Sequence, residues 1–201
     1  MQITETRFSA ELGVPVALAT ADEPLPLESL TSGELSALQS LGSATARRHW
    51  LLGRAALRTL VQQDTSRLQF PHPELSVSHA GGIAVAVRSA AKLSGIGVDF
   101  EPWRAEVHPR MADFFLRPAE QTVAGTAREL VRLWTIKEAL FKAQPDNDGC
   151  VLLDFELADP ASNCGTASGP GGSTLHYVSA DVGVGALSVA VTPMGGKYVP
   201  N

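Results

Sequence analysis

Two long stretches of the chain repeat apolar side chains at the spacing of an α-helix. The first covers residues 43–63 and the second covers residues 128–144. A shorter helix is expected after Thr31, because Glu34 follows it at the spacing of a capping box. The pattern therefore predicts two long helices and one short helix.

Short apolar runs bounded by Gly, Pro and polar residues predict β-strands around these helices. We expect strands, in chain order, at residues 13–20, on either side of Gly81 and Gly82, and at residues 94–101, 151–157, 174–180 and 185–191. The Gly- and Ser-rich segment at residues 162–173 predicts a mobile loop. Helices and strands in this order indicate an α+β protein.

The two halves of the chain resemble each other. An offset of 84 residues places Arg48 on Arg132 and Trp50 on Trp134, with Gly13 falling on Gly97. Both halves have a strand followed by a helix in this alignment. The repeat predicts two similar α+β lobes related by a pseudo-twofold axis, at residues 1–93 and 94–201, with a junction near residues 88–94.

Charge and composition exclude several classes of protein. The formal net charge is −5, with 16 basic and 21 acidic residues, which argues against a nucleic-acid-binding protein. No basic start followed by a long apolar run is present, and no apolar run approaches ~18 residues, so neither a signal peptide nor a membrane span is expected. Cys150 and Cys164 stand outside any zinc-binding pattern and are expected to be free thiols. We expect a cytoplasmic monomer.

The halves differ most at a group of acids. Asp99 and Glu101 alternate along the strand at residues 94–101 and therefore share one face, while Phe100 points to the other. Adjacent carboxylates repel unless a cation lies between them, and oxygen ligands suit Mg²⁺. Glu138 on the second long helix could complete such a site. The alternative is a solvated strand end, with Glu138 paired to Lys142 on the surface of the helix.

Basic residues could face the same cleft. Lys142 lies one turn beyond Glu138, and Arg58 lies one turn beyond Arg54, so two helices could present a metal and cations together. Such a cleft suits a polyphosphate, because Arg binds phosphate oxygens in a bidentate way and Lys acts as a point charge. His79 precedes two glycines that would let a ligand approach the backbone, although an isolated His is usually structural.

These residues carry a family resemblance. The segments "GVDFE" and "WTIKEALFK" resemble the two-part signature of the 4′-phosphopantetheinyl transferases. The upstream segments "RRHWLLGRAALR" and "LSVSHAGG" resemble motifs of the larger, surfactin-synthetase-activating type, so that the resemblance covers most of residues 44–143. It implies two α+β lobes with coenzyme A between them. It also implies transfer of the phosphopantetheine arm of coenzyme A to a serine of an apo acyl, peptidyl or aryl carrier protein, with release of adenosine 3′,5′-bisphosphate.

The resemblance also implies roles for individual residues. The ligands of Mg²⁺, or of Mn²⁺, would be Asp99, Glu101 and Glu138. The catalytic residues would be Asp99, Glu138 and Lys142, with Glu138 as general base directly or through a metal-bound water. The residues that bind coenzyme A would be Arg47, Arg48, Arg54, His79, Lys137 and Lys142. The sequence departs from the family where "SRLQFPHPE" replaces a Gly-Lys-Pro element, and in the short connection between Asp99 and Trp134.

The segment at residues 108–120 is the expected docking site for the carrier protein. It holds Met111, Phe114, Phe115 and Leu116 beside Arg110 and Arg117 just after the acidic strand. We expect at least one of the two phenylalanines to pack in the core and the other apolar side chains to form an exposed patch with an arginine rim that docks a carrier helix.

Two other functions remain open from the sequence. A Mg²⁺-dependent pyrophosphohydrolase acting on coenzyme A or a nucleotide would use the same acids and cations, with water as the nucleophile. A non-catalytic module that binds coenzyme A is the second alternative, although such a module need not retain every acid required for the metal.

Overall fold

The computed structural model describes residues 5–61, 65–103 and 109–196 and has an α+β fold with two antiparallel sheets and six α-helices in these ranges. The first half contains α1 (Glu5–Leu12), β1 (Ala17–Ala21), α2 (Ser32–Gln39), α3 (Ala44–Val61), β2 (Leu75–Ala80) and β3 (Ile83–Arg88). The second half contains β4 (Leu93–Pro102), α4 (Ala112–Phe115), α5 (Pro118–Gln121), α6 (Ala127–Ala143), β5 (Glu156–Leu157), β6 (Cys164–Ser168), β7 (Thr174–Asp181) and β8 (Gly185–Pro193). No helix in these ranges is long and apolar enough to cross a lipid bilayer.

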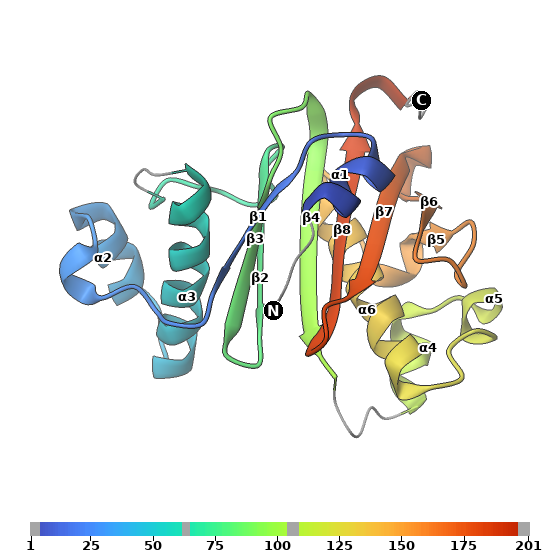
Figure 1. Ribbon diagram of the computed structural model, residues 1–201, viewed down its shortest axis with the longest axis horizontal. Coiled ribbons are helices and arrows are strands. Elements are labelled where there is room, and N and C mark those ends of the chain that lie inside the picture. Colours follow the sequence, from blue (N-terminus) through green and yellow to red (C-terminus); the bar gives the residue numbers. More distant parts are fainter. Residues whose placement is uncertain (1–4, 62–64, 104–108, 197–201) are drawn as a thin grey trace.

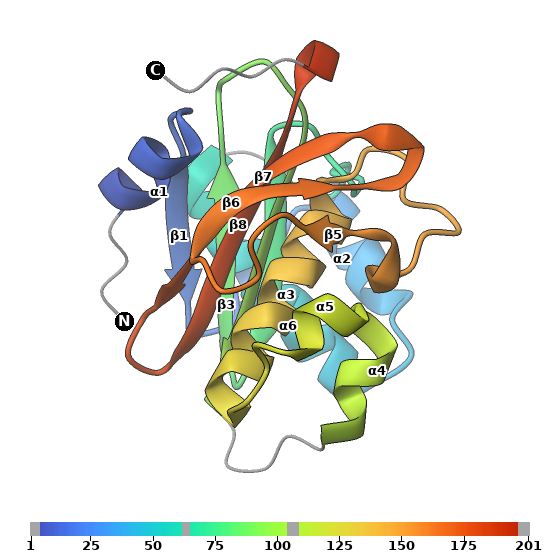
Figure 2. The same cartoon turned by 90° about the vertical axis from the view of Figure 1, so that its right-hand side faces the viewer.

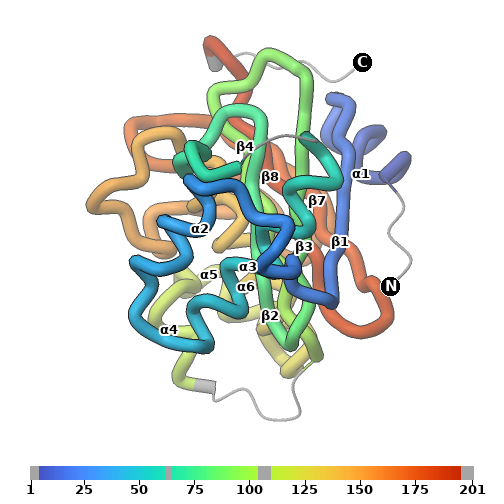
Figure 3. Tube along the Cα trace, turned by 90° about the vertical axis from the view of Figure 1, so that its left-hand side faces the viewer, coloured from blue at the N-terminus to red at the C-terminus, as the bar shows by residue number. Residues whose placement is uncertain are grey.

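The elements form four layers (Figure 1). Helix α3 covers the outer face of the sheet β1-β3-β2, and α6 covers the outer face of the sheet β4-β8-β7-β6-β5. Figure 3 shows α2 and α3 outside the first sheet, and Figure 2 shows α4, α5 and α6 on the opposite side of the molecule. The inner faces of the two sheets pack against each other.

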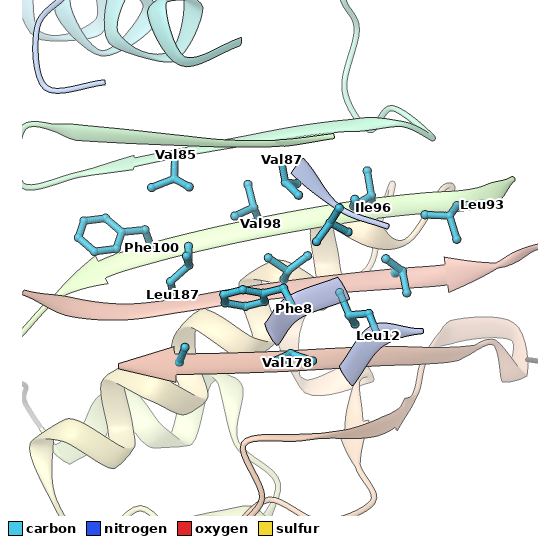
Figure 4. Close-up of a cluster of buried hydrophobic side chains, with 14 residues drawn as sticks. Phe8, Leu12, Val85, Val87, Leu93, Ile96, Val98, Phe100, Val178 and Leu187 are labelled. Atoms are coloured by element: carbon cyan, nitrogen blue, oxygen red, sulfur yellow. The ribbon is translucent and has the colours of Figure 1, made fainter. Parts of the chain in front are cut away.

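The layer between the sheets is a core that both halves share. Val85 and Val87 from β3 meet Val98 and Phe100 from β4 (Figure 4). Helix α1 also contributes to this core, although it belongs to the first half of the chain. Its side chains Phe8 and Leu12 are 1% exposed and pack beside β7 and β8 of the second sheet. Both predicted lobes therefore depend on each other for the burial of their inner faces.

The order of elements repeats in the two halves. A strand, a long helix and a hairpin occur as β1, α3, β2 and β3, and again as β4, α6, β7 and β8. The strand orders β1-β3-β2 and β4-β8-β7 correspond, and β5 and β6 extend the second sheet. A pseudo-twofold relation between the halves stays a prediction.

The sequence predicted both long helices and most of the strands, including β2, β3, β4, β7 and β8. Helices α3 and α6 are confirmed, and Thr31 and Glu34 form the predicted capping box at the start of α2. The strand expected at residues 13–20 begins only at β1, because Gly13 ends α1 with a positive φ of 65°. The alignment of Gly13 with Gly97 is therefore wrong, since Gly97 lies within β4.

Two further expectations in the second half are corrected. The segment at residues 162–173 was expected to be a loop but contains β6, whose small residues pair with β7. The strand expected at residues 151–157 is reduced to β5, because Leu152–Asp154 form a 3₁₀ turn. Helix α1 was not predicted from the sequence.

Candidate active site

The position of α6 on β4 depends on two glycines. A Cβ atom at Gly97 would overlap with the carbonyl oxygen of Ala139, and one at Gly95 would overlap with that of Ala143. The helix backbone therefore rests directly on the strand. Asp99 follows on the same face of β4, so the close packing brings this acid to the last two turns of α6.

Asp99 is the most buried of the predicted site acids and is 5% exposed. Its Oδ1 atom lies 2.7 Å from Nζ of Lys142 and 2.8 Å from Oγ of Ser78. Nζ of Lys142 also donates to the carbonyl oxygen of Val98 at 3.2 Å. The other carboxylate oxygen of Asp99, Oδ2, is buried and has no hydrogen-bond partner.

Glu138 and Glu101 lie in the electrostatic field of this pair. Burial raises the pKa of the Glu138 carboxyl, Lys142 opposes the shift, and the negative charges of Asp99 and Glu101 add to it. Asp99 and Lys142 are in direct contact, and Glu101 and Glu138 lie within electrostatic range of each other and of this pair. Repulsion among the three carboxylates is the electrostatic condition in which a bound cation stabilises them.

The donor chemistry of this group fits a divalent cation. All three side chains offer carboxylate oxygens, and Oδ2 of Asp99 is a buried oxygen without a partner. As the side chains stand, no three His, Cys, Asp or Glu residues in the described parts of the chain converge closely enough to surround an ion. The ammonium group of Lys142 instead neutralises Asp99.

Two serine side chains of β2 form hydrogen bonds with the edge of β4 that does not pair with β8. The backbone N–H of Val98 donates to Oγ of Ser76 at 3.1 Å, and that of Phe100 donates to Oγ of Ser78 at 3.4 Å. Ser76 and Ser78 are both buried and share one face of β2. The first half of the chain therefore reaches the acidic group directly.

His79 lies on the opposite face of β2 and meets His49 of α3. The two ring centroids are 4.4 Å apart, with an angle of 31° between the ring planes. Burial lowers the pKa of His79, His49 and Lys142 lower it further, and Asp99 raises it. His79 therefore lies within electrostatic range of Asp99 and Lys142, and its role in binding coenzyme A stays a prediction.

His49 was not predicted from the sequence as a site residue. A signal was present, because His49 occupies the side of α3 that also carries Leu52, Gly53 and Ala56, which are buried against the sheet. A polar ring at the end of an apolar stripe points to a neighbour across the packing interface. The partner on the strand could be identified only from the tertiary structure.

The predicted arginines have other contacts. Nη1 of Arg54 donates to the carbonyl oxygen of Thr65 at 2.8 Å, and its guanidinium lies 4.9 Å from the ring centroid of Trp50. Arg47 donates to the carbonyl oxygen of Leu41, and Arg47 and Arg48 line a separate groove between α2 and α3. The binding of coenzyme A by these arginines stays a prediction.

Lys137 is placed away from the site, which argues against the expectation that it binds coenzyme A. Its side chain is fully buried and donates to the carboxylate of Glu120 and to the carbonyl oxygen of Phe155. Glu120 also accepts hydrogen bonds from the backbone N–H groups of Arg117 and Leu157. Lys137 therefore joins α6 to α5 and β5, whereas its neighbour Glu138 faces the acids.

A cavity of about 250 Å³ opens beside Lys142. It is lined by Phe70, Pro71, Ser76, Val77, Lys142 and Asn147. Phe70 and Pro71 belong to the segment that replaces the family's Gly-Lys-Pro element. The apolar lining with one ammonium group suits a ligand that combines an apolar or aromatic part with a negative charge.

The expected docking segment is only partly exposed. Phe115 is buried in the core around α6 and Phe114 is 76% exposed, so the expectation that one of the two phenylalanines packs in the core is confirmed. The expectation that Leu116 belongs to the exposed patch is wrong, because Leu116 is buried in the same core. Arg117 donates to the carbonyl oxygen of Leu153 and pairs with Glu156 at 3.1 Å. Arg110 is exposed, and residue 108 lies outside the described part of the chain.

A comparison with protein families matches residues 95–177 to the 4′-phosphopantetheinyl transferase superfamily. The matching segment begins in β4 and ends in β7, and it includes Asp99, Glu101, Glu138 and Lys142. A comparison with curated proteins gave no match. The family match therefore falls on the half of the chain that supplies the acids.

Proposed function

We propose that this protein is a 4′-phosphopantetheinyl transferase. It transfers the phosphopantetheine arm of coenzyme A to a serine of an apo acyl, peptidyl or aryl carrier protein and releases adenosine 3′,5′-bisphosphate. The observation that carries this proposal is the contact of Lys142 with Asp99 beside Glu138, within the segment that matches the superfamily. The cavity next to Lys142 supports a binding site for the nucleotide.

The pyrophosphate of coenzyme A would lie between the two halves. Lys142 supplies a positive charge to the oxygens of the leaving phosphate, and His79 can donate a hydrogen bond from the first half. His49 lies against His79 and can orient its ring or contact the same anion. Arg47 and Arg48 carry no role in this proposal, because they line the groove between α2 and α3. Arg54 stays a proposed contact for the phosphates of coenzyme A.

Asp99, Glu101 and Glu138 would hold Mg²⁺ or Mn²⁺, which supplies charge neutralisation of the pyrophosphate oxygens when bound. The serine hydroxyl attacks the β-phosphorus, and the bond from this phosphorus to the bridging oxygen breaks. Glu138 accepts the serine proton, directly or through water. The electron pair of the broken bond leaves with adenosine 3′,5′-bisphosphate.

The resemblance of residues 44–143 and the repeated element order favour the larger, surfactin-synthetase-activating type. In that type both halves of the active site come from one chain. The hydrogen bond from Ser78 to Asp99 supports this arrangement. The exposed Phe114 and Arg110 are proposed as the remaining docking contacts for the carrier protein.

Intact-protein mass spectrometry tests the proposal. The protein is incubated with coenzyme A, Mg²⁺ and apo carrier proteins, and the carrier serine is expected to gain the mass of a phosphopantetheine arm. Glu138→Gln should prevent the gain while coenzyme A still binds. Consumption of coenzyme A without any carrier would instead support a pyrophosphohydrolase, and binding without turnover would support a non-catalytic module.

A further inference from the structure

Ser76 and Ser78 are two residues apart on β2 and make equivalent contacts with the edge of β4. Each side-chain oxygen accepts a hydrogen bond from a backbone N–H of β4, from Val98 to Ser76 and from Phe100 to Ser78. β4 pairs with β8 along its other edge. The two hydroxyl groups therefore satisfy N–H groups that a neighbouring strand would otherwise bind.

Ser78 also makes a second contact through its hydroxyl group. Its hydroxyl donates to Oδ1 of Asp99 at 2.8 Å. A serine hydroxyl has one proton, so the contact with Asp99 commits that proton while a lone pair receives the N–H of Phe100. Ser78 and Asp99 are 6% and 5% exposed, so this hydrogen bond to a charged group is shielded from water.

The contact removes the equivalence of the two oxygens of Asp99. A carboxylate rotates over a broad range about its last torsion, and a flexible lysine can follow either oxygen. Ser78 and Lys142 both donate to Oδ1, whereas Oδ2 is buried without a partner. The hydroxyl of Ser78 also accepts the backbone N–H of Phe100, which restrains its position relative to β4.

We propose that Ser78 is a positioning residue of the acidic site, which holds Oδ1 of Asp99 on Lys142 and leaves Oδ2 for a divalent cation. The inference rests on the proposed function for the identity of the cation. It assigns to the first half of the chain a direct part in forming the metal site of the second half. Ser78 acts through Asp99 and is not itself a ligand.

Ser76 provides a matched control for the experiment. Ser78→Ala and Ser76→Ala each remove one hydroxyl that accepts a backbone N–H of β4, but only the first removes a donor to Asp99. Calorimetric titration with manganese chloride, without coenzyme A or carrier, measures the cation affinity of each folded variant. We expect Ser78→Ala to weaken Mn²⁺ binding ~10-fold, about 1.4 kcal/mol, and Ser76→Ala to leave it unchanged.

A second pair of variants keeps the test valid if Ser78→Ala does not fold. Thr and Val have nearly equal volumes, and Thr retains the hydroxyl. Ser78→Thr should bind Mn²⁺ more tightly than Ser78→Val. The positioning role would be overturned by equal Mn²⁺ affinities within this pair, or by equal losses of Mn²⁺ affinity in Ser78→Ala and Ser76→Ala. Ser78 would then serve only to hold the edge of β4 against β2.

The outcome for the proposed function is separate. One outcome is that the wild-type protein transfers phosphopantetheine but removal of the Ser78 hydroxyl does not change the Mn²⁺ affinity. This outcome would overturn the inference about Ser78 and leave the proposed function standing. A protein whose Mn²⁺ affinity depends on Ser78 but which modifies no carrier would support the inference and count against the transferase.

Discussion

Nζ of Lys142 lies 2.7 Å from Oδ1 of Asp99 and joins the last turn of α6 to β4. The side chain of Asp99 is 7% exposed and that of Lys142 is 28% exposed. The lysine therefore neutralises a carboxylate that has little access to water. The same ammonium group borders the cavity, so it can contact an anion bound there.

Lys142→Met should leave Asp99 buried without its cation and abolish phosphopantetheine transfer. Without added metal the variant should melt at a lower temperature than the wild type. Magnesium chloride should raise its melting temperature by more than it raises that of the wild type, because no ammonium group competes for the carboxylates. Thermal denaturation with and without the salt measures this difference. Lys92→Met, at an exposed position, serves as the control, and an equal response in both variants would contradict the prediction.

Gly97→Ala should separate α6 from β4. The new methyl group would overlap with the backbone of Ala139, so the helix must move and carry Glu138 and Lys142 away from Asp99. We expect a loss of ~1–3 kcal/mol in the free energy of unfolding and a larger relative loss of transfer activity. Urea denaturation and the mass-gain assay measure the two effects. The methyl group added by Gly42→Ala would extend into open space, so this control variant should change neither the stability nor the transfer activity.

Lys137→Met should destabilise the fold without weakening coenzyme A binding. It removes the cation from a Glu120 side chain that is 1% exposed, and breaking a buried ion pair costs ~3–5 kcal/mol. Combining it with Glu120→Gln should recover part of the loss, because the unpaired charge disappears. Chemical denaturation measures the stability, and calorimetry on the folded fraction measures the affinity. A large fall in coenzyme A affinity would return Lys137 to the binding site.

Acid should destabilise the first half of the chain through Glu34. Burial alone raises the pKa of this carboxyl, but hydrogen bonds from Arg58, Thr65 and the backbone of Thr31 and Thr65 lower it to about 2, from 4.5 in the unfolded chain. Because the folded pKa is the lower one, the stabilisation is complete above pH 4.5 and is lost as the pH falls toward 2. The shift is worth ~3 kcal/mol.

The pH dependence of urea unfolding measures this contribution. Glu34→Gln should lower the stability at neutral pH and remove much of the decline between pH 4.5 and 2. An unchanged slope in the variant would assign the acid sensitivity to other carboxylates.

Phe114→Ser combined with Arg110→Glu should weaken docking of the carrier protein. Phe114 is 76% exposed, and carrier proteins are generally acidic, so the change removes apolar contact and reverses the local charge. We expect the KM for the carrier to rise several-fold with an unchanged affinity for coenzyme A. Steady-state kinetics and calorimetry measure the two constants. Met194→Ser removes another exposed apolar side chain and should not affect either; an unaltered carrier KM in the double variant would place the docking site elsewhere.

Local sequence patterns predicted the parts of the site that neighbouring residues determine. Alternation along a strand separated Asp99 and Glu101 from Phe100, and Phe100 is buried in the shared core. Helical periodicity placed Glu138 and Lys142 on one side of α6, and both lie near Asp99. These relations depend on backbone geometry within one element, so the sequence determined them.

The tertiary structure decided which of two adjacent charged side chains on α6 faces the acids. Lys137 and Glu138 are neighbours in the sequence, but successive side chains of a helix point ~100° apart. One enters the core with Glu120, and the other faces the acids. The amino-acid sequence contains no local signal for this choice, because either charged side chain could have faced the cleft.

The sequence by itself determined the two long helices, the acidic strand and the resemblance to phosphopantetheinyl transferases. Packing between segments distant in the chain decided the rest: α1 crosses to the second sheet, His49 meets His79, and Ser78 contacts Asp99. The physical reason is that periodicity reports which side of an element is buried, whereas the partner on the other side is selected by complementary shape, hydrogen bonding and charge across the assembled layers.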